Sequence, residues 1–149
     1  MKNMKKLLIF LLTLTLLGCK PVEKIEVDKD FTLTLFYIET CADCRIFKKK
    51  AIPLLQETYG DRITIEQFDL DADGIQTIYD PIIDSLEDFD EEMYGLGPLI
   101  VIEGYFAKLG YIEGDEDFLI EDINLVLQGK EMGDELGAYR YIYKDEYHY

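Results

Sequence analysis

Cys41 and Cys44, separated by two residues, are the part of this sequence best suited to chemistry. The apolar residues 31–37 before them predict a strand, and the amphipathic residues 45–59 after them predict a helix, with apolar positions close to a 3.6-residue period. The N–H groups and positive dipole end of a helix N-terminus favour a thiolate, which is the nucleophile in disulfide exchange. The pair therefore predicts a redox-active dithiol. We assign Cys41, the more exposed sulfur of such a motif, as the attacking thiol and Cys44 as the resolving one.

The third cysteine, Cys19, follows a leader that carries lysines before an apolar run at residues 7–17. This pattern is typical of a secretory signal, and the run is too short for a confident membrane span. Residues 16–19, Leu-Leu-Gly-Cys, resemble the lipobox of bacterial lipoproteins, in which the cysteine is acylated and becomes the mature N-terminus. We expect residues 1–18 to be a lipoprotein signal peptide and Cys19 to carry lipid, palmitate included, on the extracytoplasmic face of the cell membrane. An ordinary secretory signal with a chance cysteine, or an uncleaved anchor, is the alternative.

The cysteine count and the charge limit the cofactors and partners. With Cys19 assigned to lipid, only the Cys41–Cys44 pair remains, so no thiol is left for a zinc site, which needs four ligands. The single histidine, His148, lies one residue from the end of the sequence and is expected to be an exposed tail residue. We therefore expect no cofactor and no metal. The net charge of −16 argues against a nucleic-acid partner, because phosphate contacts need a basic face.

One acidic segment resembles a calcium-binding loop. Residues 69–74 place acids at the first, third and fifth positions of a calcium loop and Gly74 at the sixth. The twelfth position is Asp80 rather than a longer glutamate, and a strand rather than a helix leads in. A turn followed by a helix N-cap at Asp73 is the simpler interpretation, with calcium as the alternative.

The remaining periodicity predicts one domain over residues 31–130. Strands are expected at residues 63–68, 99–102 and 106–113, a partly helical acidic stretch at 75–94, and a helix at 115–128. We expect Pro53 to kink or divide the first helix and Pro81 to break the second, since proline removes a helical hydrogen bond.

Two segments flank this domain. Residues 19–30 are expected to be a tether, or in part an extra strand. Residues 131–149 form a tyrosine-rich tail in which Tyr139, Tyr141 and Tyr143 alternate as on one face of a strand. This tail is expected to be an added edge strand or a loose end, and a partner-docking surface is the other interpretation.

The order strand, Cys-x-x-Cys helix, strand, helix, Gly97-Pro98, strand, strand, helix resembles the thioredoxin-like family. The resemblance covers about residues 31–130. It implies an α/β fold with a central mixed sheet and helices on both faces. It also implies that Pro98 follows a cis peptide bond and packs against the disulfide, and that the backbone of Gly97 pairs with bound substrate.

Three departures from the family pattern bear on the chemistry. Thr40 stands where typical thioredoxins have a tryptophan before the first cysteine. Leu35 stands where they have a buried acid, so Cys44 would be deprotonated by water or by another group. The chain between the cysteines and Pro98 is longer than in a minimal thioredoxin. We assign the insertion to the acidic residues 75–94, where it would cap the site or contact a partner.

The resemblance implies an enzyme, a membrane-anchored thiol–disulfide oxidoreductase that exchanges disulfides with exported proteins of the cell envelope and with a redox partner protein. Whether the enzyme would reduce or oxidise its substrates depends on the charges around Cys41. Glu39 and Asp43 should raise the pKa of the Cys41 thiol, whereas the helix dipole, Arg45 and Lys48 should lower it. A pKa of about 7 then favours a reductase.

The three consecutive lysines that begin at Lys48 are expected to be a solvated helix face, with stabilisation of the Cys41 thiolate as the alternative. A rival function is a non-enzymatic lipoprotein of the same fold that binds a partner, or Cu(I) through its two thiolates. Copper carriers usually add a Met or His ligand, and none lies within ten residues of Cys41.

Overall fold

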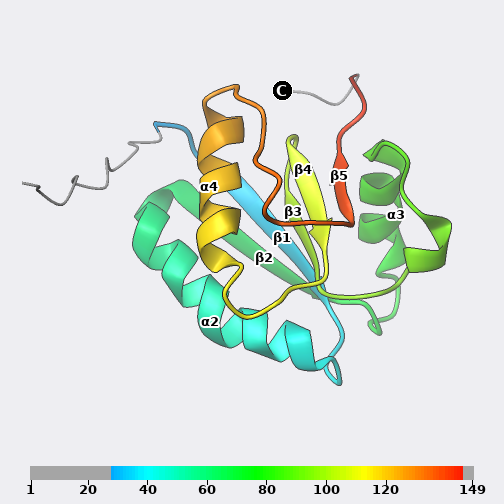
Figure 1. Cartoon of the computed structure of the whole chain (residues 1–149). Coiled ribbons are helices and arrows are strands. Elements are labelled where there is room, and N and C mark those ends of the chain that lie inside the picture. Colours follow the sequence, from blue (N-terminus) through cyan, green and yellow to red (C-terminus); the bar gives the residue numbers. More distant parts are fainter. Residues whose placement is uncertain (1–27, 146–149) are drawn as a thin grey trace, which may run out of the picture.

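The computed structural model describes residues 28–145 and is built on one mixed sheet (Figure 1). Its five strands are β1 (Phe31–Tyr37), β2 (Ile63–Asp69), β3 (Leu99–Ile102), β4 (Phe106–Leu109) and β5 (Arg140–Ile142). They lie in the order β2-β1-β3-β4-β5. β1 and β2 are parallel, with Phe31 opposite Ile63, and every other neighbouring pair is antiparallel. The predicted α/β fold with a central mixed sheet is confirmed.

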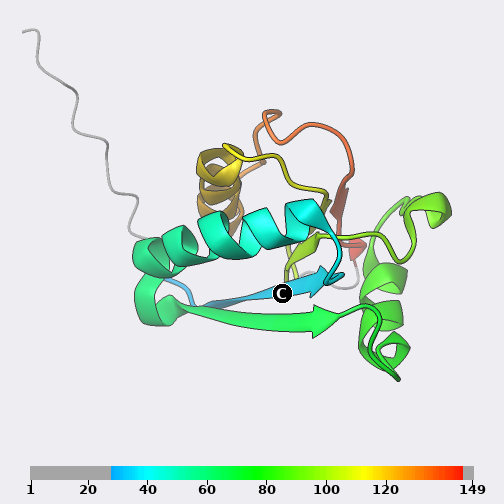
Figure 2. The ribbon, with the colours of Figure 1, turned by 90° about the horizontal axis from the view of Figure 1, so that it is seen from below.

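Helices cover both faces of this sheet, as predicted (Figure 2). α2 (Ala42–Tyr59) and α4 (Glu116–Leu127) pack on one face, and α3 (Gln76–Ser85) packs on the other. Two short 3₁₀ turns, η1 (Gly60–Arg62) and η2 (Glu91–Met93), complete the helical elements of the described part. α2 makes the crossover that the parallel pair β1 and β2 requires. It therefore begins at the end of the sheet where β1 finishes.

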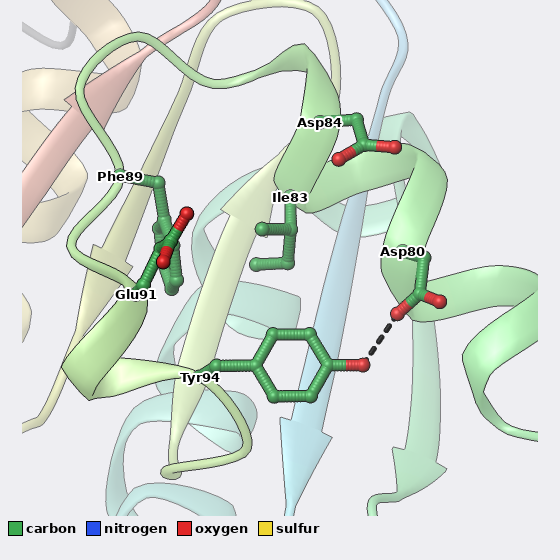
Figure 3. Close-up of a pocket in the computed structure, with 6 residues that line it drawn as sticks. All are labelled: Asp80, Ile83, Asp84, Phe89, Glu91 and Tyr94. Carbon is green, nitrogen blue, oxygen red and sulfur yellow. Dashed lines mark hydrogen bonds between the residues drawn. The ribbon is translucent and has the colours of Figure 1, made fainter.

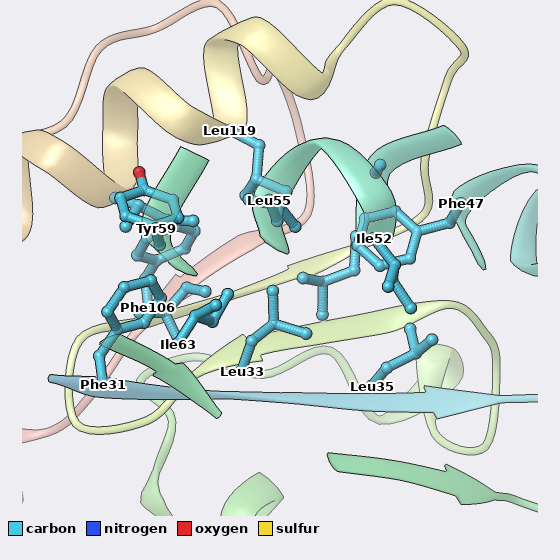
Figure 4. Close-up of a cluster of buried hydrophobic side chains, with 14 of the residues drawn as sticks. Phe31, Leu33, Leu35, Phe47, Ile52, Leu55, Tyr59, Ile63, Phe106 and Leu119 are labelled. Atoms are coloured by element: carbon cyan, nitrogen blue, oxygen red, sulfur yellow. The ribbon is translucent and has the colours of Figure 1, made fainter. Parts of the chain in front are cut away.

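β1 is an inner strand of the sheet, and both of its faces are buried. Leu33 and Leu35 point toward α2 and α4, in the cluster drawn in Figure 4, whereas Phe36 points toward α3. The Phe36 ring packs in a T-shaped arrangement with the Tyr79 ring of α3 at a centroid distance of 5.0 Å. Cores on both sides therefore fix the position of the strand that leads into the cysteines.

Two predicted helix breaks, at Pro53 and Pro81, are wrong. α2 is not divided at Pro53, and α3 continues through Pro81. Both prolines are exposed, so each ring lies away from the core and the buried face of its helix remains intact. Packing of that face outweighs the one hydrogen bond that each proline removes.

Two predicted boundaries also differ from the structure. α3 begins at Gln76 without a side-chain cap, so the predicted N-cap at Asp73 is wrong. The last strand of the predicted hairpin ends at Leu109 rather than at residue 113. Gly110 follows with a φ of 79° and donates its N–H to the Pro98 carbonyl at 2.8 Å, which turns the chain out of the sheet.

The tyrosine-rich tail supplies the edge strand β5, which is one of its two expected conformations. β5 pairs with β4, and the next residue, Tyr143, forms a bridge with Leu86 beyond α3. Tyr141 and Tyr143 are buried in the cluster on the α3 side. Tyr139 is exposed and has a φ of 59°. The prediction that it shares one face with Tyr141 and Tyr143 is therefore wrong.

A buried ion pair fixes this C-terminal segment to α4. The Asp122 carboxylate, 3% exposed, accepts from Arg140 Nη1 at 2.7 Å and from the Gly133 N–H at 2.8 Å. Burial raises the pKa of Asp122, although Arg140 opposes this shift. Lys108 of β4 adds a hydrogen bond to the Ala138 carbonyl at 3.0 Å. The segment is therefore held by specific polar contacts at Arg140 and, before it, at Gly133 and Ala138.

Candidate active site

Cys41 and Cys44 form a disulfide at the N-terminus of α2, with their Cα atoms 5.3 Å apart. Cys41 is the N-cap residue of the helix, and its Sγ accepts the backbone N–H of Cys44 at 3.1 Å. Cys41 is partly exposed, whereas Cys44 is 1% exposed. The geometry therefore leaves Cys41 as the sulfur that another molecule can reach, with Cys44 behind it.

A short turn after β1 delivers the cysteines to this position. The Cys41 N–H donates to the Ile38 carbonyl at 3.0 Å, which closes the turn between strand and helix. The Tyr37 carbonyl at the end of β1 accepts from the Leu70 N–H at 2.8 Å, so β2 supports the same end of the sheet. Because β1 is buried on both faces, this turn starts from a rigid element.

Gly97 lies directly against the sulfur pair, and Pro98 follows it. The predicted cis peptide bond between them is confirmed. The Gly97 carbonyl oxygen is 3.4 Å from Cys41 Sγ, and a Cβ at position 97 would lie 3.3 Å from Cys44 Sγ. Pro98 is buried and leads into β3. That these two residues bind substrate stays a prediction.

We expect Gly97→Val to destabilise the fold and disturb the disulfide. The new side chain would meet Cys44 Sγ, the Phe36 carbonyl oxygen at 3.4 Å and Tyr37 Cα at 3.5 Å, so the neighbours would have to move. Overpacking of this kind lowers the free energy of unfolding by roughly 1–3 kcal/mol, which urea denaturation will measure. Gly97→Ala, which adds one carbon, should have a smaller effect. A fully stable valine variant would contradict the close approach of Gly97 to Cys44.

The basic side chains near the cysteines have partners other than the sulfurs. Lys48 Nζ lies 2.8 Å from the centroid of the Tyr37 ring and 4.0 Å from Glu39 Oε1. Arg45 donates to the Glu39 backbone carbonyl at 3.2 Å. These contacts do not support the alternative that the lysine cluster holds the Cys41 thiolate.

The contact between Lys48 and Tyr37 was not anticipated from the sequence. Partial burial is the main cause of the raised pKa of the Tyr37 hydroxyl. The negative charges of Glu39 and Asp69 raise this pKa further. Lys48 follows Cys44 by one helical turn. This spacing is the only feature of the sequence that suggests that the Lys48 side chain lies near the cysteines. Leu35 is completely buried and apolar, so it cannot accept a proton from Cys44.

The acidic stretch at residues 75–94 forms α3 and the segment that returns to Gly97. These elements form the walls of a pocket of 530 Å³ that is open to solvent, drawn in Figure 3. The pocket is lined by Asp80, Ile83, Asp84, Phe89, Glu91 and Tyr94. The Tyr94 hydroxyl donates to the Asp80 carboxylate, and this bond raises the pKa of Tyr94 to about 12.

Two side chains of the possible calcium loop, those of Asp69 and Asp80, accept hydrogen bonds within the protein. Asp69 accepts the backbone N–H of Asp71 at 3.0 Å, and Asp80 accepts from Tyr94. Within residues 28–145, no three His, Cys, Asp or Glu side chains lie together as a possible metal site. Calcium binding at residues 69–80 therefore receives no support.

Several expectations concern residues outside the described range. Cys19, the signal peptide, most of the tether and His148 fall there. In the part of the chain that the structure describes, no helix is both long enough and apolar enough to cross a membrane. Comparison of the chain with family models, curated proteins and solved structures found no match.

Proposed function

We propose that this protein is a thiol–disulfide oxidoreductase of thioredoxin-like fold. The observation that carries the proposal is the disulfide at the N-terminus of α2, with Cys41 accessible and Cys44 buried behind it. Two further features support it. Strands β2, β1, β3 and β4 have the order and directions expected for this fold, and Gly97 lies against both sulfurs, where the family carries its cis-proline loop.

The reaction uses the two cysteines in sequence. In the reduced protein, the Cys41 thiolate attacks one sulfur of a substrate disulfide, forms a mixed disulfide and releases a substrate thiolate. The Cys44 thiolate then attacks Cys41 Sγ, restores the Cys41–Cys44 disulfide and releases the second substrate thiolate. Two electrons and two protons pass from the protein to the substrate. A redox partner protein must return them for the next cycle.

The helix terminus favours the first step. The Cys44 N–H, which points at Cys41 Sγ, would donate to the thiolate, and the positive end of the helix dipole adds to this stabilisation. The acids Glu39 and Asp43 oppose it, because like charges disfavour a thiolate. We therefore propose that the pair is a reductant rather than a strong oxidant.

The proposed location is the extracytoplasmic face of the cell membrane, with Cys19 as the lipid anchor and exported proteins as substrates. The lipobox-like residues 16–19 support the anchor. Compartments outside the cytoplasm are also those in which disulfides form and persist. A mature N-terminus at any residue other than Cys19 would contradict this part of the proposal.

Dithiothreitol-driven reduction of insulin tests the enzymatic proposal. We expect the wild-type protein to accelerate precipitation of the insulin B chain catalytically, because each turnover cleaves an insulin disulfide. Cys41→Ser should reduce the rate to that of dithiothreitol alone. Stoichiometric Cu(I) binding without insulin turnover would instead favour a binding protein.

A further inference from the structure

The pocket beside α3 has preformed walls (Figure 3). The Tyr94 side chain reaches across to Asp80, and its ring also packs in a T-shaped arrangement with the buried Tyr79 ring at a centroid distance of 5.1 Å. Phe89 packs against the buried Tyr141 ring at 4.8 Å. Contacts to buried residues therefore hold both aromatic walls without a ligand, as in most binding sites.

The pocket lies close along the chain to Gly97, which contacts the disulfide. Tyr94 precedes Gly97 by three residues, which span at most about 11 Å of extended chain. The Gly97 carbonyl oxygen is 3.4 Å from Cys41 Sγ, and the intervening Leu96 is 47% exposed. A polypeptide that presents a disulfide to Cys41 can therefore extend a neighbouring side chain into the pocket.

The lining combines apolar surface with free negative charge. Within residues 28–145, the carboxylates of Asp84 and Glu91 have no ion-pair partner. Lys144 donates to the Asp84 backbone carbonyl rather than to its carboxylate. Ile83 and the two rings can pack against an aliphatic stem, and the carboxylates can pair with a cationic head group. Lysine and arginine side chains have both parts, whereas an acidic side chain would be repelled.

We propose that this pocket binds a lysine or arginine side chain of the substrate, so that the preferred substrates are polypeptides with basic residues close to the reacting disulfide. The inference rests on the proposed function, since it assigns a substrate class to the same disulfide. Asp43, exposed beside Cys41, extends the acidic surface and favours the same substrates.

Two synthetic peptides test the inference. Each carries one intramolecular disulfide, flanked by lysines in the first peptide and by glutamates in the second. We expect kcat/KM to be about tenfold higher for the lysine peptide at low salt, and the difference to shrink as ionic strength rises. Asp84→Asn combined with Glu91→Gln should reduce this preference roughly threefold or more.

A matched control separates the pocket from overall charge. Glu57→Gln combined with Glu121→Gln removes the same charge from exposed positions on α2 and α4, on the opposite face of the sheet. This variant should retain the preference. An equal loss of preference in both variants would overturn the inference, because general electrostatics would then explain the effect.

The outcomes also separate the inference from the proposed function. Equal kcat/KM for the two peptides in the wild-type protein would overturn the inference and leave the oxidoreductase intact. Failure to reduce either peptide or a small neutral disulfide, such as hydroxyethyl disulfide, would overturn the proposed function. If the double pocket variant does not fold, Asp84→Asn alone, compared with Glu121→Gln alone, decides the question by the same comparison of preference.

Discussion

Cys44→Ser will accumulate as a mixed disulfide with its substrate. Cys41 can still attack, but the sulfur that would release the substrate is gone, so the intermediate persists. Incubation of the reduced variant with insulin or a disulfide peptide should give a covalent adduct at Cys41, detected by mass spectrometry without reductant. Turnover should fall to the uncatalysed rate.

Cys41→Ser is the matched control for this trapping experiment. It retains one thiol at the same helix terminus, but that thiol is Cys44, which is 1% exposed. We expect little or no adduct from it. Equal amounts of adduct from the two variants would contradict the assignment of Cys41 as the attacking sulfur.

Arg140→Met will strongly destabilise the protein, by about 3–5 kcal/mol of unfolding free energy, because it leaves the buried Asp122 carboxylate without its cation. The measurement is urea denaturation at neutral pH. Arg62→Met is a matched control, since Arg62 pairs with the exposed Asp28 at 3.2 Å and such pairs contribute about 1 kcal/mol or less. Similar losses in the two variants would contradict a dominant role for the buried pair.

The destabilisation by Arg140→Met should depend on pH. The folded-state pKa of Asp122 is raised above its usual value, and loss of Arg140 removes a group that lowers it. A raised folded-state pKa favours folding below the unfolded-state pKa, about 3.9, and this contribution is lost as the pH rises through the folded-state value. The loss of unfolding free energy caused by Arg140→Met should therefore be smaller at pH 4 than at pH 7. Adding Asp122→Asn should recover part of the lost stability, since asparagine still accepts from Gly133 without a charge.

The sequence was sufficient to predict the elements around the disulfide, because their signals are local. The alternating apolar residues of β1 and the helical period after Cys44 each lie within one element. The position of Gly97 beside the sulfurs followed from the family resemblance rather than from any local pattern. The predicted breaks at Pro53 and Pro81 were wrong because exposure of each ring, which is a tertiary property, decides whether a helix tolerates a proline.

Long-range polar contacts were not predictable from the sequence. Asp122 and Arg140 lie in different elements, and nothing in either segment identifies the other as its partner. The pocket was anticipated only as an acidic insertion near the site. Its walls depend on Tyr79 and Tyr141, which come from separate parts of the chain and meet only in the folded protein.

The reduction potential of the Cys41–Cys44 pair tests the central claim most directly. The protein would be equilibrated in glutathione buffers of graded ratio, quenched with acid and alkylated, and its reduced and oxidised forms counted by mass spectrometry. We expect one reversible two-electron transition with a midpoint below about −180 mV. A midpoint of about −120 mV would contradict the proposal that the pair acts as a reductant. Absence of any exchange with glutathione would contradict the claim that this disulfide is redox-active.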